Sequence, residues 1–430
     1  MKKIFSIILI FSIYILSQYN ANSETLQLSI AQAEAYAVSH NISLQNSSLE
    51  IKKAEAQSWQ ALASMLPQIS GSFDYQNYCG YKMELMGMSI PMNPVGTLGV
   101  TASVSVSGAQ IVSAMLVDLA IDMADLTVKQ NEQKIKSQVR QIYISILAME
   151  RTLSLLDSNL LNLQNLYSIT DNAVKAGAAE QTSADQISIQ VAAMNNTINS
   201  TKRSVEMLYN SLKLQMGTDV NTSILLTDNL ENILQVNEAQ SLLNTKFDIN
   251  NNYSYQLLLR NSELSDKQIT LAKVNYLPSL RAFYQYSYKT YFGAEAGMNM
   301  TPPNLIGLSL SVPIYSSGVT SNKIEEAEIS KQIVDNNLID SKNALLIQDQ
   351  QLRYNLTTAL EDFEHQQNNI DVSQRVFESI LRKYKYGTAT SMDVTTASTN
   401  LLTAHSTYIQ SILNLCNAQI ALEDLLNNKR

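Results

Sequence analysis

The residues that could carry chemistry are few in this chain of 430 residues, and their spacing gives no catalytic or metal site. Its three histidines, His40, His365 and His405, have no second ligand at helical or zinc-site spacing. The two cysteines, Cys79 and Cys416, form no CxxC pair and no disulfide framework. No nucleophile or phosphate-binding loop stands out. We therefore predict a protein that is not an enzyme and that uses no metal or cofactor.

Two short turns hold the other polar residues whose spacing is informative. Gly177 precedes Thr182-Ser183-Ala184-Asp185, and Gly387 precedes Thr390-Ser391-Met392-Asp393. Glycine favours the C-terminal cap of a helix, and Thr or Ser favours the N-cap of the next helix. Each site is thus predicted to be a tight helical hairpin with an aspartate near the start of the returning helix, where the helix dipole stabilises a negative charge.

Helix-breaking residues indicate which elements lie between these turns. All seven prolines fall within residues 67–94 and 278–313, and ten of the 13 glycines lie between 71 and 108 or between 293 and 318. The rest of the chain is therefore available for long helices.

The two windows are copies of each other. Leu66-Pro67 recurs as Leu277-Pro278, Gly99 as Gly307, and the Thr-Ser-x-Asp segment at 182 as that at 390, with offsets of 211, 208 and 208 residues. A near-constant offset shared by three landmarks predicts an internal duplication of helix, strand hairpin, long helix, turn and helix.

Inside each window the pattern changes to strict alternation. Apolar residues at every second position face one side of the predicted strands: Ile69, Phe73, Tyr75, Leu98, Val100, Val104, Val106, Leu280, Tyr284, Tyr286, Tyr288, Leu308, Leu310, Val312 and Ile314. Runs of about ten residues are typical of membrane strands, whereas strands of a soluble sandwich, the alternative, are usually about five or six residues long. Aromatic residues near the strand ends, Tyr75, Tyr78, Tyr284, Tyr286 and Tyr288, predict a belt at the membrane interface.

Four strands per chain cannot close a barrel. An open strand edge in lipid leaves unpaired N–H and C=O groups, each costing several kcal/mol. Eight strands from two copies would fill with side chains, whereas 12 strands from three copies would be wide enough to hold water. The strand pattern therefore predicts a homotrimer in contact with membrane lipid.

The helical tracts 109–176 and 318–386 carry apolar residues at alternating steps of four and three, which predicts left-handed supercoiling against neighbouring helices. In the first tract the pattern comprises Val139, Ile142, Ile146, Met149, Leu153, Leu156, Leu160 and Leu163, continuing through Tyr167 to Val174. The second tract has a more polar version: Leu356, Ala359, Phe363, Gln366, Ile370, Ser373, Phe377, Ile380 and Tyr384. Each tract would extend about 100 Å if continuous.

The N-terminus indicates an exported protein, and the charge balance indicates that the mature chain is acidic. Lys2-Lys3, an apolar run and small residues up to Ser23 are typical of a secretory signal peptide. Without those two lysines, the 30 basic residues fall to 28 against 38 acidic ones, so nucleic acid is a poor partner. We expect a signal peptide at 1–23, a first repeat at 24–217 with its strand hairpin at 67–107, an equatorial linker at 218–246, and a second repeat at 247–430 with its hairpin at 278–315.

In this order of features the sequence resembles the TolC, or outer membrane efflux protein, family. The resemblance rests on Leu66-Pro67 and Leu277-Pro278, on LSVPIYSSG at 310–318, and on YKYGTATSMDV at 384–394. It implies a membrane α+β fold, in which a trimeric 12-stranded β-barrel in the bacterial outer membrane continues as a long α-helical coiled-coil barrel into the periplasm. It also implies two partners, a periplasmic adaptor (membrane fusion) protein and an inner-membrane pump.

The resemblance further implies a periplasmic gate at the hairpin turns. Tyr384 matches the family's gate tyrosine, Asp393 an acidic position after the turn, and Asp185 its counterpart in the first copy. In a trimer the aspartates would form acidic rings that favour cations, although a role at the helix N-terminus explains each aspartate equally well. Ala389 departs from the best-known member of the family, which has a basic residue there. The adaptor is expected at the turn residues Gly177, Ala178, Thr182, Ser183, Gly387, Thr388, Ala389, Thr390 and Ser391.

The function expected from these features is passive conduction of small molecules through an exit duct of a tripartite efflux system. An exit duct for type I protein secretion is an alternative with the same architecture. A trimeric coiled-coil surface adhesin or scaffold is an alternative of another class, but a fibre anchor needs no second strand hairpin in mid-chain.

Overall fold

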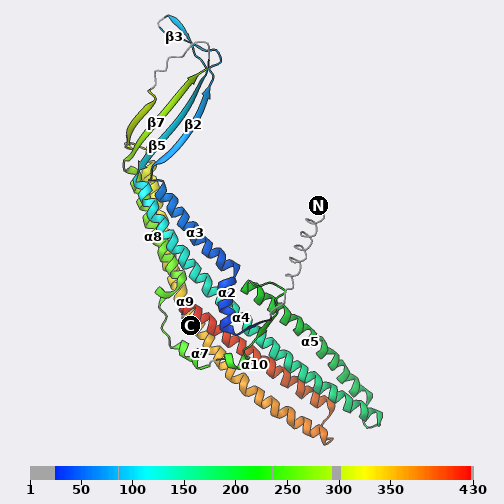
Figure 1. The fold of residues 1–430 in the computed structure, drawn as a ribbon. Coiled ribbons are helices and arrows are strands. Elements are labelled where there is room, and N and C mark those ends of the chain that lie inside the picture. The colour runs from blue at the N-terminus through cyan, green and yellow to red at the C-terminus, as the bar shows by residue number, and fades with distance from the viewer. Residues whose placement is uncertain (1–24, 86, 235, 293–301, 428–430) are drawn as a thin grey trace, which may run out of the picture. The chain divides into compact units, whose positions relative to one another are not determined.

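The computed structural model describes residues 25–85, 87–234, 236–292 and 302–427, so the predicted signal peptide at 1–23 lies outside it. Figure 1 shows the elements in chain order. The strands are β1 (Leu26–Leu28), β2 (Gln68–Gln76), β3 (Lys82–Leu85), β4 (Met88–Pro91), β5 (Val95–Val106), β6 (Ile224–Leu226), β7 (Ser279–Tyr291) and β8 (Asn304–Ser311). The helices are α2 (Ile30–His40), α3 (Ile42–Ala63), α4 (Gly108–Lys175), α5 (Gln181–Met216), α6 (Leu230–Ile233), α7 (Val236–Leu243), α8 (Tyr253–Lys273), α9 (Val319–Lys385) and α10 (Ser391–Leu426), with short 3₁₀ turns at Ile249–Asn251 and Val274–Tyr276.

The described residues divide into two compact units, to which both predicted repeats contribute. One combines the chain up to Ser47 with residues 128–253 and with the stretch from Asn343 onwards. The other consists of residues 48–127 and 254–342. The first unit contains both helical hairpin turns, and the second contains the predicted strands.

One four-stranded antiparallel sheet, in the order β2-β5-β7-β8, dominates the second unit. It joins strands from both copies, because β5 pairs with β7 along its whole length, from Val95 opposite Tyr291 to Val106 opposite Leu280. Strong alternation and long uninterrupted runs made these four strands predictable.

Two details of the strands differ from the prediction. A separate hairpin, β3 with β4, occupies residues 82–91, where no strand was predicted. In addition, β8 ends at Ser311, so Val312 and Ile314 lie outside the strand. Pro313 has no N–H with which to continue a ladder, which explains the early end.

The two long helices closely match the predicted tracts, since α4 has 68 residues and α9 has 67. The predicted seam residues of α4, from Val139 to Leu163, are all buried or half-buried, as are those of α9 from Leu356 to Tyr384. The extension of the α4 seam to Tyr167 is wrong. Tyr167 is 37% exposed, while Leu166 and Thr170 are buried. A straight helix has 3.6 residues per turn, so it drifts away from a 3.5-residue repeat.

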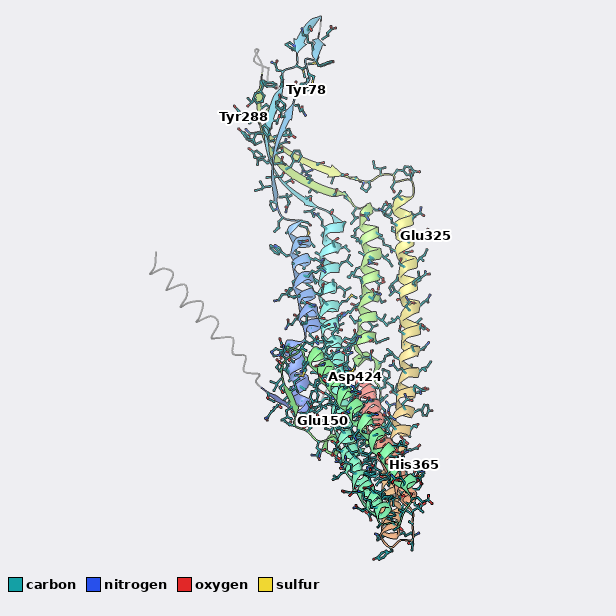
Figure 2. All side chains as sticks on the ribbon, turned by 90° about the vertical axis from the view of Figure 1, so that its right-hand side faces the viewer. Tyr78, Glu150, Tyr288, Glu325, His365 and Asp424 are labelled. Carbon is teal, nitrogen blue, oxygen red and sulfur yellow. The ribbon has the colours of Figure 1, made fainter. Side chains whose placement is uncertain are left out.

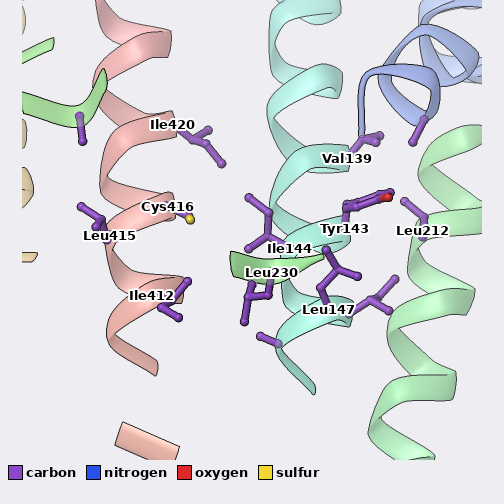
Figure 3. Close-up of a cluster of buried hydrophobic side chains, with 14 of the residues drawn as sticks. Val139, Tyr143, Ile144, Leu147, Leu212, Leu230, Ile412, Leu415, Cys416 and Ile420 are labelled. Carbon is purple, nitrogen blue, oxygen red and sulfur yellow. The ribbon is translucent and has the colours of Figure 1, made fainter. Parts of the chain in front are cut away.

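The core of the first unit lies where α4, α5 and α10 pack around the linker. Figure 3 shows Ile144 of α4 on the side of Cys416 and Ile420 of α10, and Tyr143 of α4 on the side of Leu212 of α5. The linker contributes β6, which pairs in parallel with β1.

Tyr143 joins the linker to the N-terminal elements through its hydroxyl. This fully buried hydroxyl donates to the Leu28 carbonyl or to Asp228 Oδ2, each 2.9 Å away. Asp228 Oδ2 in turn accepts the Ile30 N–H at 2.7 Å. Burial is the main cause that raises the Tyr143 pKa to about 12, so this hydroxyl keeps its proton.

Candidate functional site

The first hairpin turn is a two-hydrogen-bond helix cap centred on Gly177. Gly177 adopts a left-handed φ of +71°. Its N–H donates to the Val174 carbonyl at 2.9 Å, and the Ala178 N–H reaches back to the Ala173 carbonyl at 2.8 Å. This pattern is the Schellman motif, and it satisfies two carbonyls that the end of α4 leaves unpaired.

The second turn repeats this geometry at Gly387, whose φ is +72°. The Gly387 N–H donates to the Tyr384 carbonyl at 3.0 Å, and the Thr388 N–H donates to the Lys383 carbonyl at 2.9 Å. The Thr388 hydroxyl adds a third bond, to the same Lys383 carbonyl at 3.0 Å. The C-terminal caps of α4 and α9 therefore form as the glycines predicted.

The returning helices begin differently. Thr390 is the N-cap of α10, and it forms a capping box with Asp393: the Thr390 hydroxyl accepts the Asp393 N–H, and the Asp393 carboxylate accepts the Thr390 N–H at 2.8 Å. In the first turn the N-cap is Glu180, whose side chain makes no capping bond to a backbone N–H and instead accepts a bond from the Thr182 hydroxyl at 3.3 Å. The expectation that Thr182 or Ser183 caps this helix is wrong, because both lie within its first turn.

The two hairpins are therefore equivalent at an offset of 210 residues, not 208. Gly177 and Gly387, the last residues of α4 and α9, and the first residues of α5 and α10 all share that offset. The offset places Asp393 opposite Ser183, and Asp185 opposite Thr395. Asp185 is thus not the counterpart of Asp393, and the shared Thr-Ser-x-Asp letters align positions two residues apart on the helix.

The predicted gate residues make separate contacts within this chain. The Tyr384 hydroxyl bonds to Thr170 Oγ1 at 3.2 Å, which ties α9 to α4. The Asp185 carboxylate is exposed and accepts a bond from the Gln181 side chain at 2.9 Å. Hydrogen bonds from the Thr390 backbone N–H, and then from its hydroxyl, lower the pKa of Asp393. Asp393 therefore carries a negative charge near neutral pH.

A groove of about 810 Å³ separates the two hairpins near their turns. Ala178, Glu180, Ala389 and Thr390 lie at its turn end, and Leu166 and Phe377 lie deeper. Leu166 and Val394, which line the groove, belong to a small buried cluster with Ile187, against which Tyr384 packs. The turns predicted to contact a partner thus border a hollow, half-apolar surface.

In the second unit the sheet has one apolar, solvent-exposed face. The strand register places these side chains on one side of all four strands. With exposures from 38% to 82%, they are Ile69, Phe73, Tyr75, Leu98, Val100, Val106, Leu280, Tyr284, Tyr286, Tyr288, Ile306, Leu308 and Leu310. We call this set the apolar face. Apolar side chains gathered over a whole sheet mark a surface that meets another apolar phase.

The predicted belt tyrosines lie in the second unit, where Figure 2 labels Tyr78 and Tyr288. Tyr284, Tyr286 and Tyr288 follow one another at every second position of β7, so they form a column along the strand. Tyr75 meets the ring of Phe292 edge-on at 5.9 Å, and Tyr78 lies beyond the end of β2. No helix among the described residues has the length and apolar content needed to cross a membrane.

A polar network near the end of α10 was not predicted. Arg140 Nε donates to Glu34 at 2.7 Å, and its Nη1 donates to the buried Glu423 at 2.8 Å. Asp424, labelled in Figure 2, accepts bonds from Ser137 at 2.5 Å and from Gln133. These partners are more than 100 residues apart in sequence, and the packing of α2 and α10 on α4 brings them together.

Residues 259–428 match the model of the outer membrane efflux protein family. No curated protein matches the chain in sequence. Among solved structures, the chain is similar to the CmeC outer membrane channel of Campylobacter jejuni, with 15% identity, a TM-score of 0.76, and coverage of 92% of this chain and 85% of that one. The outer membrane protein VceC of Vibrio cholerae has 14% identity and a TM-score of 0.74, with coverage of 92% of this chain and 95% of that one. The open MtrE channel of Neisseria gonorrhoeae has 13% identity and a TM-score of 0.70, with coverage of 92% of this chain and 88% of that one.

The likeness in structure covers nearly the whole chain, and the match in sequence covers most of the predicted second repeat. Together they confirm the resemblance that the sequence motifs indicated. The chain therefore has the fold of TolC-like outer-membrane channels, and its residues 259–428 match the outer membrane efflux protein family.

Proposed function

We propose that this chain is the outer-membrane exit duct of a tripartite efflux system. In this role it conducts small molecules passively from a periplasmic adaptor and an inner-membrane pump to the exterior. The observation that carries the proposal is the apolar face, which an aqueous environment on both sides of the sheet does not explain. Lipid against that face would cover all of its exposed side chains, and burial of apolar area is worth roughly 25 cal/mol per Å².

The strand edges support assembly into a ring of three chains. Within one chain β2 and β8 each pair with a single neighbour and lie at the two edges of the sheet. In lipid, β8 of one copy must pair with β2 of the next, because an open edge leaves backbone groups without partners. Three copies of the four-stranded sheet give 12 strands, wide enough for a water-filled lumen.

Helix α9 supports the same assembly. Ile329, Ile333, Ile339 and Ile347 of this helix are 50% to 67% exposed. Isoleucines in such numbers on one long helix are unusual against water, and a neighbouring copy in a helical barrel would cover them. The energy for transport comes from a partner pump, since the sequence holds no phosphate-binding loop.

Purified protein tested in planar lipid bilayers would provide the main experiment. We expect stable single-channel conductance from the trimer and cross-linking of purified protein to a three-chain species. A trimer that inserts but never conducts would refute the duct and would favour the adhesin or scaffold alternative. A monomer in detergent that shows no three-chain species would refute the ring itself.

The adaptor is tested at the turns. A photoreactive side chain at Ala178 or Ala389 borders the groove between the hairpins, and we expect it to capture a periplasmic adaptor in cells. A matched probe at Val220, an exposed linker residue, serves as the control. Equal capture from all three positions would contradict docking at the turns.

A further inference from the structure

The face of the sheet opposite the apolar face is polar, and its charges are unevenly placed. Lys289 and Asp74 share one cross-strand row, since both flank Thr97. Arg281 occupies a different row, between Ser105 on β5 and Ser309 on β8. Opposite charges in one row offset each other, whereas Arg281 has only hydroxyl neighbours in its own row. Arginine contributes a cationic guanidinium group, so this row holds a positive charge.

A glycine and a phenylalanine hold this arginine against the sheet. Phe283 pairs with Gly307, and a Cβ atom added at Gly307 would lie only 2.5 Å from Phe283 Cζ. The tip of the ring therefore occupies the space that the glycine leaves. Arg281 Cζ is 5.8 Å from the centre of that ring, within the range of a cation–π contact. Gly307 thus lets Phe283 stay close to the sheet, and Phe283 in turn orients Arg281.

Arg281 also lies at a defined level of the sheet. Strand β7 begins at Ser279, directly after Pro278, so Arg281 is near the end of the sheet from which the helical part of the chain continues. If the apolar face meets lipid, the polar face lines the lumen, because membrane strands alternate between the two.

We propose that Arg281 forms an anion-attracting ring in the lumen of the duct and that the ring favours solutes carrying a carboxylate, sulfonate or phosphate group. This inference rests on the proposed function, since three copies are needed to close the ring. Rings of charged side chains set the ion preference of a pore. Here the Arg281 ring lies in the sheet, whereas the acidic residues Asp185 and Asp393 lie at the helical turns.

The test is the reversal potential of purified trimers in a potassium chloride gradient across a planar bilayer. We expect Arg281→Gln to shift the reversal potential toward the potassium equilibrium value, and Arg281→Lys to keep most of the wild-type value. Lys289→Gln is the matched control, because Asp74 already offsets that charge, and we expect a smaller shift. An Arg281→Gln channel with an unchanged reversal potential would refute the ring.

Gly307→Ala tests the positioning role of the glycine. The added methyl must push the Phe283 ring off the sheet, so we expect lower single-channel conductance, restored by the double variant Gly307→Ala with Phe283→Ala. Unchanged conductance in Gly307→Ala, or no recovery in the double variant, would contradict this arrangement. A wild-type trimer without any conductance would instead refute the proposed function, so the two failures are distinguishable.

Discussion

Three glycines at helix C-termini share one backbone conformation but differ in their surroundings, which makes them a matched series. Gly177, Gly217 and Gly387 have φ values of +71°, +69° and +72°. A Cβ added at Gly177 or Gly387 would have no neighbour within 4 Å. A Cβ at Gly217 would overlap the backbone carbonyl of His40 and approach the Cα of Asn41. The first two glycines are therefore needed only for their conformation, and the third is needed for space as well.

The expected losses of unfolding free energy follow from this difference. Placing alanine in the left-handed conformation costs about 1–2 kcal/mol, and this applies to all three sites. At Gly217 the added methyl must also displace the corner between α2 and α3. Asn41, which is buried there, donates to the Gln215 carbonyl at 2.7 Å and accepts the Leu44 N–H. Losing those bonds at a buried site adds about 1–3 kcal/mol, for a total of roughly 2–5 kcal/mol.

The assay is urea unfolding of the purified protein in detergent, followed by circular dichroism at the helical band. All three glycines lie in the same compact unit, so the same unfolding transition reports on each of them. We expect Gly217→Ala to lower the unfolding free energy by at least 1 kcal/mol more than Gly177→Ala or Gly387→Ala does. Equal losses at the three sites would refute the assigned role of the His40 carbonyl.

Three further predictions concern buried or capped groups of the same unit. Burial raises the pKa of Asp424, so protonation of this carboxyl stabilises the folded state. That contribution to the unfolding free energy is complete below pH 3.8 and is lost as the pH rises through the raised pKa. Asp424→Asn should flatten this part of the pH profile of the unfolding free energy, measured by urea unfolding. The bonds from Thr390 lower the pKa of Asp393, so the ionised carboxylate stabilises the second turn above pH 3.8, and this stabilisation is lost as the pH falls through the lowered pKa. Asp393→Asn should remove this pH dependence, measured as amide hydrogen exchange at the second turn. Tyr143→Phe should lower the unfolding free energy by about 1.5–3 kcal/mol, because the buried hydroxyl bonds the Asp228 carboxylate, and a loss below 0.5 kcal/mol would contradict that contact.

Local patterns in the sequence predicted most of the regular structure. The strands were accessible because apolar residues alternate without interruption, as from Leu98 to Val106, and the ends of α4 and α9 because a glycine follows each. The β3–β4 hairpin was missed because the alternation there is short and lies between prolines. The bonds of Tyr143 and Arg140 could not be foreseen, since they join segments far apart in sequence and depend on how the helices pack.

The helical turns show why matching letters were an insufficient guide to the candidate site. Thr-Ser-x-Asp occurs in both copies, but it begins at the N-cap in one turn and two residues later in the other. A motif with three polar residues fits several positions of a first helical turn, because the N-cap and the positions after it accept the same residue types. The helix ends, fixed by Gly177 and Gly387, give the correct equivalence.

The corrected equivalence also separates the two roles open to the aspartates. The Asp393 carboxylate bonds the backbone N–H and the hydroxyl of Thr390, so it serves first to start α10. Asp185 lies two residues further along its helix than Asp393 does, and its exposed carboxylate accepts a bond from the Gln181 side chain. In an assembled ring Asp185 is therefore the better candidate to act on passing cations. We expect Asp185→Asn to reduce cation preference in bilayer recordings and Asp393→Asn mainly to loosen the turn. The opposite assignment would follow if only Asp393→Asn moved the reversal potential.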